Sequence, residues 1–461
     1  MAQGRSKLVI VAVLMLAVLA LLPVGGAVAQ ETIDVQDTSV TFAFPDAINF
    51  HISASGPDPI VRAELRYIAP QLACGNVVAT GLPVFTPGTD VDLTWEWDLL
   101  ERGGLPVGAN IRYQWVLEDE SGRSIETPEQ TIVFEDPRFE WRTVESSRAT
   151  VHWYFGDEPF ANDLLRTAEA GFDQLEANTG ATPSDRVHIY LYEDSGTLQS
   201  ALAFPNEWTG GIAFSPFGLV AIGVSPFNLE WGRRAMVHEM THVVIYQATF
   251  TCGASIPLWL NEGLAMFNEG PTETAFRRAL QTAIDSDEVY ALRSLAGSFP
   301  NDADEALLAY AQSESLVTYL VEEYGPGRMQ ELFEVFRDVG TINAAMEHVY
   351  GFDQEGLNRL WRESVGLSTL DAAPTPTVPS FVLPTIEPLG PATGFDPEGE
   401  AQTPTPTASP TPAPTATLLP TPTPASGSGC NANGAPAAGV DITALASFLA
   451  LGFVGWRRRW K

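Results

Sequence analysis

Lysine is almost absent from this chain of 461 residues. It occurs only as Lys7 and Lys461, near the two ends, so arginine supplies the positive charge of everything between them. Lysine and arginine together number 25, against 57 aspartates and glutamates, and the formal net charge is −32. A chain this acidic is repelled by phosphate backbones and by anionic headgroups. The composition therefore argues against nucleic-acid binding and against electrostatic binding to anionic lipid.

Cysteine and histidine are scarce as well. Three cysteines are too few for a scaffold held together by disulfides. Cys74 and Cys252 are able to pair in an oxidising exterior, which leaves Cys430 over, but the sequence does not establish that the two are close. The histidines are more informative, because two of the six fall within one segment of five residues.

That segment, residues 238–242, reads His-Glu-Met-Thr-His. Two histidines four positions apart lie on one face of a helix, so the imidazoles of His238 and His242 can reach a single Zn²⁺. Glu239 would then face the open side of the metal, where it can take a proton from water. Apolar residues flank the motif on both sides, which is typical of a buried helix. The alternative is a pair of core histidines satisfied by neighbours, but burying these three side chains without a metal is costly.

A catalytic zinc needs a third protein ligand. The metzincin pattern would place glycine at 245 and histidine at 248, where this chain has isoleucine and alanine, so a carboxylate is left. Glu262 follows the second histidine by twenty residues, on a second predicted helix. Glu269, in a repeat of the same Asn-Glu-Gly triplet, is a competing candidate. Gly263 would allow the second helix to approach another backbone closely.

The motif at 238–242, followed by Trp-Leu-Asn-Glu-Gly-Leu-Ala at 259–265, resembles the gluzincin metallopeptidases, and most closely the bacterial peptidase MA-like domain family. Residues 208–214, upstream of the motif, and residues 310–315, downstream of it, resemble the same family. Together these stretches cover roughly residues 140–365.

The resemblance implies a role for each matching residue. His238, His242 and Glu262 would bind zinc, so the resemblance favours Glu262 over Glu269. Glu239 would act as general base toward the attacking water and then as general acid toward the leaving amine. The implied cofactor is Zn²⁺, and the implied substrate is a peptide or protein.

Gluzincins often add a tyrosine or histidine that stabilises the oxyanion, and Tyr310 stands at a matching place. Tyr319 and Tyr324 are rivals for this role, and simple packing is the other explanation of Tyr310. Residues 210–214 resemble the edge strand along which such enzymes align an extended peptide. An ordinary core strand with a glycine bulge explains the same residues equally well.

The remaining histidines indicate structure rather than chemistry. His152 and His188 lie in alternating patterns that predict strands, and we expect them on the faces of a sheet. His51 and His348 have no companions at ligand spacing, so we interpret both as structural.

The ends of the chain predict export and anchoring. Residues 1–29 carry basic residues, then an apolar run, then Ala-Val-Ala, which is typical of a signal peptide. Residues 369–429 form a Pro/Thr-rich linker that cannot bury a core and is predicted to be a disordered stalk. Residues 430–461 end in a short apolar span followed by arginines. They predict a C-terminal transmembrane anchor in the cell membrane or a processed sorting signal.

Two folded domains are predicted between these ends. Residues 30–137 contain short alternating segments separated by turn clusters, for example at 55–58, which predict an all-β immunoglobulin-like sandwich. This sandwich is a spacer, a substrate-binding module or a stabilising partner of the peptidase. Residues 138–368 predict an α+β zincin-like peptidase domain, in which a small sheet is followed by helices.

The sequence thus predicts an exported, surface-anchored zinc metallopeptidase. The alternative hypothesis is a non-catalytic cell-surface binding protein that uses a zincin scaffold. The residue that separates the two is Glu239, because a scaffold without activity has no need of a general base.

Overall fold

A computed structural model describes residues 32–75, 77–204 and 210–368. The predicted signal peptide, the Pro/Thr-rich stalk and the C-terminal anchor lie outside these residues, as does Trp208 of the family-like segment. Within the described part of the chain, no helix is both long and apolar enough to cross a membrane.

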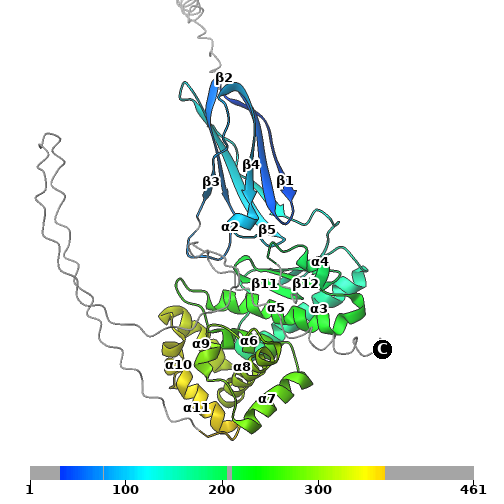
Figure 1. Cartoon of the computed structure of the whole chain (residues 1–461), viewed down its shortest axis with the longest axis vertical. Helices are drawn as coiled ribbons and strands as arrows, with labels where there is room; N and C mark the ends of the chain where they lie inside the picture. Colours follow the sequence, from blue (N-terminus) through cyan, green and yellow to red (C-terminus); the bar gives the residue numbers. More distant parts are fainter. Residues whose placement is uncertain (1–31, 76, 205–209, 369–461) are drawn as a thin grey trace, which may run out of the picture. The chain divides into compact units, whose positions relative to one another are not determined.

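The first part of the chain is a β-sandwich of seven strands joined by antiparallel pairing (Figure 1). The longest strand, β2, pairs with β1 and β4 along its first half and with β5 and β3 along its second half. β5 also pairs with β6 and β7. The strands are β1 (Asp34–Ala43), β2 (Ala47–Ile68), β3 (Ala79–Gly81), β4 (Gly88–Asp98), β5 (Ala109–Asp119), β6 (Ser124–Glu126) and β7 (Gln130–Phe134), with the short helix α2 (Leu99–Arg102) after β4.

One predicted turn of the sandwich is wrong. The cluster at 55–58 does not reverse the chain, and β2 runs straight through it. The pairing of β2 with β4 instead shifts register between Ser55 and Ile60. Proline has no N–H for a ladder and glycine tolerates irregular backbone, so these residues interrupt pairing without ending the strand. Both halves bury apolar side chains, such as Phe50 and Leu65, and this keeps the strand extended. The immunoglobulin-like topology stays a prediction.

The second sheet has five strands in the order β11-β12-β10-β9-β8. The three central strands are parallel, and each edge strand is antiparallel to its neighbour. The strands are β8 (Arg142–Glu145), β9 (Ala149–Trp153), β10 (Val187–Tyr192), β11 (Gly211–Phe214) and β12 (Leu219–Gly223). The predicted small sheet followed by helices is present, with one long helix between β9 and β10, so this part of the chain is mixed α/β.

Both faces of this sheet are buried. Ile189 and Leu191 join a core with the helices α3 (Glu158–Thr179) and α5 (Leu229–Thr249). Tyr190 and Tyr192, which alternate with them, belong to a core that also contains the interior of the β-sandwich. Burial on both faces explains why the tyrosines of β10 are buried as fully as its aliphatic residues. The sandwich is therefore packed on the peptidase sheet.

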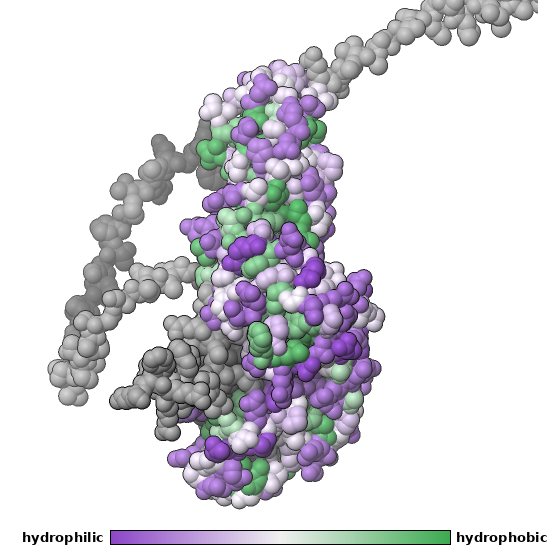
Figure 2. Space-filling view, turned by 90° about the vertical axis from the view of Figure 1, so that its right-hand side faces the viewer, coloured by the Kyte–Doolittle hydropathy of each residue, from purple (hydrophilic) through white to green (hydrophobic). Residues whose placement is uncertain are grey.

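The rest of the peptidase part is helical (Figure 1). α6 packs against α5 on one side and α8 on the other. Hydrophilic side chains cover most of the face shown in Figure 2, and hydrophobic ones lie in small separate patches. The helices after α5 are α6 (Leu258–Asn268), α7 (Thr274–Ser286), α8 (Ala303–Tyr324), α9 (Pro326–Val339), α10 (Ile342–Tyr350) and α11 (Gln354–Ser364); the short helix α4 (Ser195–Gln199) precedes β11.

Candidate metal centre

The His-Glu-Met-Thr-His motif lies in the middle of α5, as its spacing predicts. α5 is covered by the sheet, by α3 and by α6, so its motif residues are buried. His238 and His242 are 1% and 2% exposed, and their ring centroids are 4.9 Å apart on one side of the helix. Glu239 is 0% exposed. Three ionisable side chains in one turn of a buried helix require compensating charge nearby.

α6 adds a carboxylate beside these side chains, and a glycine positions α6. A Cβ atom at Gly263 would lie 2.4 Å from the backbone oxygen of Ser313 in α8, closer than a real side chain allows. Without a side chain there, α6 packs directly on the backbone of α8. The preceding residue, Glu262, is fully buried against α5. The close approach predicted for Gly263 is confirmed.

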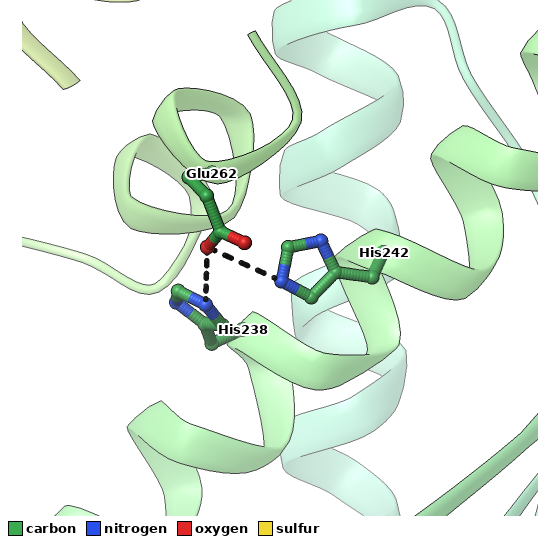
Figure 3. Close-up of side chains that lie close together, drawn as sticks. All are labelled: His238, His242 and Glu262. Atoms are coloured by element: carbon green, nitrogen blue, oxygen red, sulfur yellow. Dashed lines mark ion pairs between the residues drawn. The ribbon is translucent and has the colours of Figure 1, made fainter. Parts of the chain in front are cut away.

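The carboxylate of Glu262 converges with both imidazoles (Figure 3). Its Oε2 atom lies 3.4 Å from Nε2 of His238 and 3.6 Å from Nε2 of His242. One ligand atom from each of the three residues falls within 4.8 Å of the others. Two imidazole nitrogens and one carboxylate oxygen are a donor set of catalytic zinc, which keeps its fourth position open. The structure thus brings together the three residues predicted as metal ligands.

Glu269, the competing carboxylate, lies on the opposite side of His238. Its Oε2 atom is 2.9 Å from Nδ1 of His238, and its Oε1 atom accepts a hydrogen bond from Nη2 of Arg234 at 2.7 Å. Such a carboxylate fixes the ring orientation and the tautomer of a metal-binding histidine. This positioning role was not predicted from the sequence. In the sequence, the repeated Asn-Glu-Gly triplet draws attention to Glu269, but only as a rival metal ligand.

The centre has more negative than positive charge. Burial acts to lower the pKa of His238, but Glu262 and Glu269 outweigh it and raise this pKa to about 10. Burial, together with the charges of Glu262 and Glu269, raises the pKa of Glu239 to about 8, although His238 acts to lower it. Both groups thus hold protons more strongly than usual. A divalent cation among these residues would supply the missing positive charge, so the donor set and its surroundings fit Zn²⁺.

Glu239 lies against the edge strand β11. A Cβ atom at Gly211 would be 3.0 Å from Cγ of Glu239 and 3.1 Å from its Oε1 atom. Any larger residue at this position of β11 would press on the carboxylate. The absence of a side chain at Gly211 therefore leaves space for the carboxylate of Glu239. The sequence does not predict this contact.

Tyr310 lies near the same carboxylates. It is in α8, 7% exposed, with its ring packed edge-on against Phe299 at 5.0 Å. Burial, followed by the charges of Glu262 and Glu239, raises the pKa of Tyr310 well above its usual value. The hydroxyl therefore stays protonated, as a hydrogen-bond donor must.

The rival tyrosines belong to a different part of α8. The rings of Tyr319 and Tyr324 are 6.2 Å apart, and Tyr324 also contacts Tyr350 and Phe352. Both therefore take part in an aromatic cluster between α8 and α10.

The other histidines lie away from the motif. His152 and His188 are on neighbouring strands of the sheet, as expected, with Nε2 of the first 3.0 Å from Nδ1 of the second. His51 lies in the sandwich on β2, and His348 is exposed on α10.

The family model of the peptidase MA superfamily matches residues 167–366, a range that includes every residue of the centre. No curated protein matches the chain. Among solved structures, an M1 zinc metallopeptidase from Deinococcus radiodurans is 16% identical, with 76% of this chain and 97% of that chain covered and a TM-score of 0.29. A mutant of it bound to a Tyr-Ser-Ala substrate is 14% identical, with 75% and 97% covered and a TM-score of 0.31.

A third similar structure is a catalytically inactive OgpA from Akkermansia muciniphila in complex with an O-glycopeptide substrate. It is 15% identical, with 23% of this chain and 29% of that chain covered and a TM-score of 0.18, so the match spans less than a third of the OgpA chain. With TM-scores this low, the assignment rests on the family model and on the motif. Residues 167–366 of this chain therefore match the peptidase MA superfamily.

Proposed function

We propose that this protein is a zinc metallopeptidase of the gluzincin type that hydrolyses peptide bonds. The observation that carries the proposal is the convergence of His238, His242 and Glu262 within 4.8 Å, next to the buried carboxylate of Glu239. The family match supports it independently. His238, His242 and Glu262 would hold the metal, and bound zinc would supply a Lewis acid that polarises the peptide carbonyl and activates water.

Glu239 is the proton carrier in this proposal. Its carboxylate accepts a proton from the attacking water and delivers it to the nitrogen of the leaving amine. Both transfers are efficient when the pKa of the carrier lies near the working pH. Burial raises the pKa of Glu239, and the positive charge of a bound metal would act to lower it toward a value at which the carboxylate accepts a proton from water. The burial that raises the pKa also excludes bulk water from the transfer.

Tyr310 and β11 would position the substrate. The protonated hydroxyl of Tyr310 is a suitable donor to an oxyanion, because burial, followed by the charges of Glu262 and Glu239, raises its pKa. β11 is an edge strand of the described sheet and pairs there with β12. An extended peptide is able to pair with the outer edge of β11, which runs past Glu239 at Gly211.

The substitution Glu239→Gln tests the proposed chemistry. Glutamine preserves the shape of the side chain but cannot carry the proton. We expect zinc content of one ion per chain and thermal stability close to that of the wild type. Hydrolysis of peptides should fall by at least roughly 10² to 10⁴. A chelator should abolish wild-type activity, and added zinc should restore it.

Equal hydrolysis by the wild type and Glu239→Gln, both fully loaded with zinc, would show that this motif does not carry out the reaction. Absence of cleavage by the loaded wild type across a broad peptide library would favour the non-catalytic binding protein instead.

Export and surface anchoring are part of the proposal on sequence grounds alone. Residues 1–29 have the pattern of a signal peptide, and residues 430–461 have that of a membrane anchor or sorting signal. Truncation before Gly439 should therefore release folded protein into the medium, measured by immunoblotting of medium and cells. Retention of the truncated protein on cells would place the attachment elsewhere in the chain.

A further inference from the structure

A cavity of about 340 Å³ lies beside the metal centre, and His242 forms part of its wall. The C-terminal half of α5 contributes Tyr246 and Thr249, and α6 contributes Asn261. The loop between these two helices supplies most of the remaining wall, including Ser255. The cavity is thus next to the position where a scissile bond would lie, and its volume is at the lower end of that of small-ligand pockets.

The wall of this cavity is neutral although the chain is strongly acidic. None of the described residues that line it is an aspartate, glutamate, lysine or arginine. The wall combines apolar surface, such as that of Ile245 and Phe250, with hydroxyl and amide groups, such as those of Thr249 and Asn261. A charged group entering the cavity would lose its hydration without meeting an opposite charge, which is costly.

The loop that forms part of the cavity wall is covalently linked to the β-sandwich. Cys252 in this loop is disulfide-bonded to Cys74 in the segment that follows β2, so the pairing considered from the sequence is present. The same segment makes two hydrogen bonds to the peptidase part. The backbone nitrogen of Leu72 donates to the oxygen of Pro216 at 2.7 Å, and the hydroxyl of Tyr246 donates to the oxygen of Leu72 at 3.2 Å.

Within the loop, the only described β-pairing is an isolated bridge between Thr251 and Ala254. Gly253 has a φ of 119°, a conformation that glycine adopts readily and other residues avoid. With so few backbone contacts of its own, the loop depends on the disulfide and on its neighbours for its position. Cys74 and Cys252 are both exposed, so a reductant can reach the bond.

Building on the peptidase function proposed above, we propose that this cavity is a substrate subsite for a large uncharged side chain next to the scissile bond, and that the disulfide between Cys74 and Cys252 holds its loop wall in place. The β-sandwich thereby contributes to substrate selection through a covalent bond. Phenylalanine, leucine and tyrosine match the subsite in size and neutrality, and aspartate and lysine do not.

The experiment measures kcat/KM for peptides in which the residue on each side of the scissile bond is varied among phenylalanine, leucine, alanine, aspartate and lysine. At one of the two positions, we expect phenylalanine and leucine to exceed aspartate and lysine by at least about 10²-fold. Equal rates for all five residues at both positions would overturn the proposal.

A filling substitution locates the preference in this cavity. Ser255 is an exposed residue of the loop wall, so Ser255→Phe should be tolerated by the fold while it occupies the subsite. We expect the ratio of kcat/KM for phenylalanine to that for alanine substrates to fall at least roughly tenfold. The matched control is Ser294→Phe, at an exposed serine outside the cavity, which should leave the ratio unchanged. An unchanged ratio in Ser255→Phe would overturn the proposal.

Binding separates failure of the subsite from failure of the peptidase function. The probes are two peptide hydroxamates that differ only in carrying a phenylalanine or an aspartate side chain, measured by calorimetry on zinc-loaded protein. Suppose that the wild type cleaves no peptide and still binds the phenylalanine hydroxamate more tightly than the aspartate hydroxamate. If Ser255→Phe abolishes this difference in affinity, the subsite is supported and the peptidase function is not. Equal affinities for both hydroxamates would refute the subsite whether or not peptides are cleaved.

The double substitution Cys74→Ala and Cys252→Ala tests the role of the disulfide. We expect the phenylalanine to alanine ratio to fall roughly 2- to 10-fold because the loop must be ordered when substrate binds. If this variant does not fold, the folded wild type is reduced with a phosphine, since thiol reductants bind zinc. An unchanged ratio after loss of the disulfide would show that the bond does not hold the subsite.

Discussion

Glu269 offers the sharpest test of how the metal centre is oriented. The substitution Glu269→Gln removes one charge and changes little else in shape. The carboxylate contacts Nδ1 of His238 at 2.9 Å and Nη2 of Arg234 at 2.7 Å, so it joins a buried histidine to a partly buried cation. Glutamine has a single oxygen for these two partners, and its amide group repels whichever donor it faces.

The expected loss follows from the position of Glu269 behind the ligand. Removing such a partner of a metal-binding histidine costs 10- to 100-fold in metal affinity, which is about 1.4 to 2.7 kcal/mol. The loss should appear as a higher dissociation constant for zinc, measured by competition with a fluorescent chelator at constant pH. Loss of Glu262, the proposed carboxylate ligand, should weaken zinc binding further, because a three-ligand site has no spare.

The matched control is Glu273→Gln. The Oε1 atom of Glu273 lies 3.8 Å from Nη1 of Arg234, and the residue makes no described contact with His238. This variant changes the same arginine and the same formal charge without changing the ligand. Wild-type zinc affinity in Glu269→Gln, or an equal loss in both variants, would refute the orienting role.

Two further predictions concern stability. Gly263→Ala should lower the free energy of unfolding by about 1–3 kcal/mol because its Cβ would meet the oxygen of Ser313 at 2.4 Å, whereas Gly297→Ala, which meets no atom within 4 Å, should have little effect in thermal unfolding. Burial, followed by the charge of His188, lowers the pKa of His152 to about 3, so between pH 6.5 and 3 the unfolded state binds a proton that the folded state rejects. Wild-type stability should therefore fall on acidification below about pH 6.5, by at most about 1.4 kcal/mol per pH unit from this residue, and His152→Asn should show a shallower loss in denaturant titrations.

The parts of the centre that the sequence predicts are those set by local geometry. The four-residue spacing of His238 and His242 fixes both imidazoles on one side of α5, whatever surrounds the helix. Local signals set the bounds of α3 in the same way, because Asp157 caps its first turn and Gly180, with a φ of 71°, ends it.

The parts that the sequence does not predict depend on contacts between distant segments. Glu269 and Glu262 occur in identical triplets, and only the packing of α6 on α5 places one beside Nε2 of His238 and the other beside Nδ1. The space that Gly211 leaves for Glu239 arises in the same way, from a strand and a helix. Residues 55–58 of β2 have a propensity for a turn, but the two halves of the strand on either side of them pair with β4 and β5. This pairing outweighs the local propensity.

The core that β10 shares with the β-sandwich limits where the chain can be cut without loss of folding, in a truncated protein or in recombination. A fragment starting near residue 138 would expose Tyr190, Tyr192 and Phe214 to water, since their burial includes the other side of that cut. Such fragments invite aggregation, and a transplanted catalytic segment would need a replacement cover for that face. Recombination that preserves folding should therefore exchange residues 32–368 as one module, although the zinc motif itself occupies a single helix.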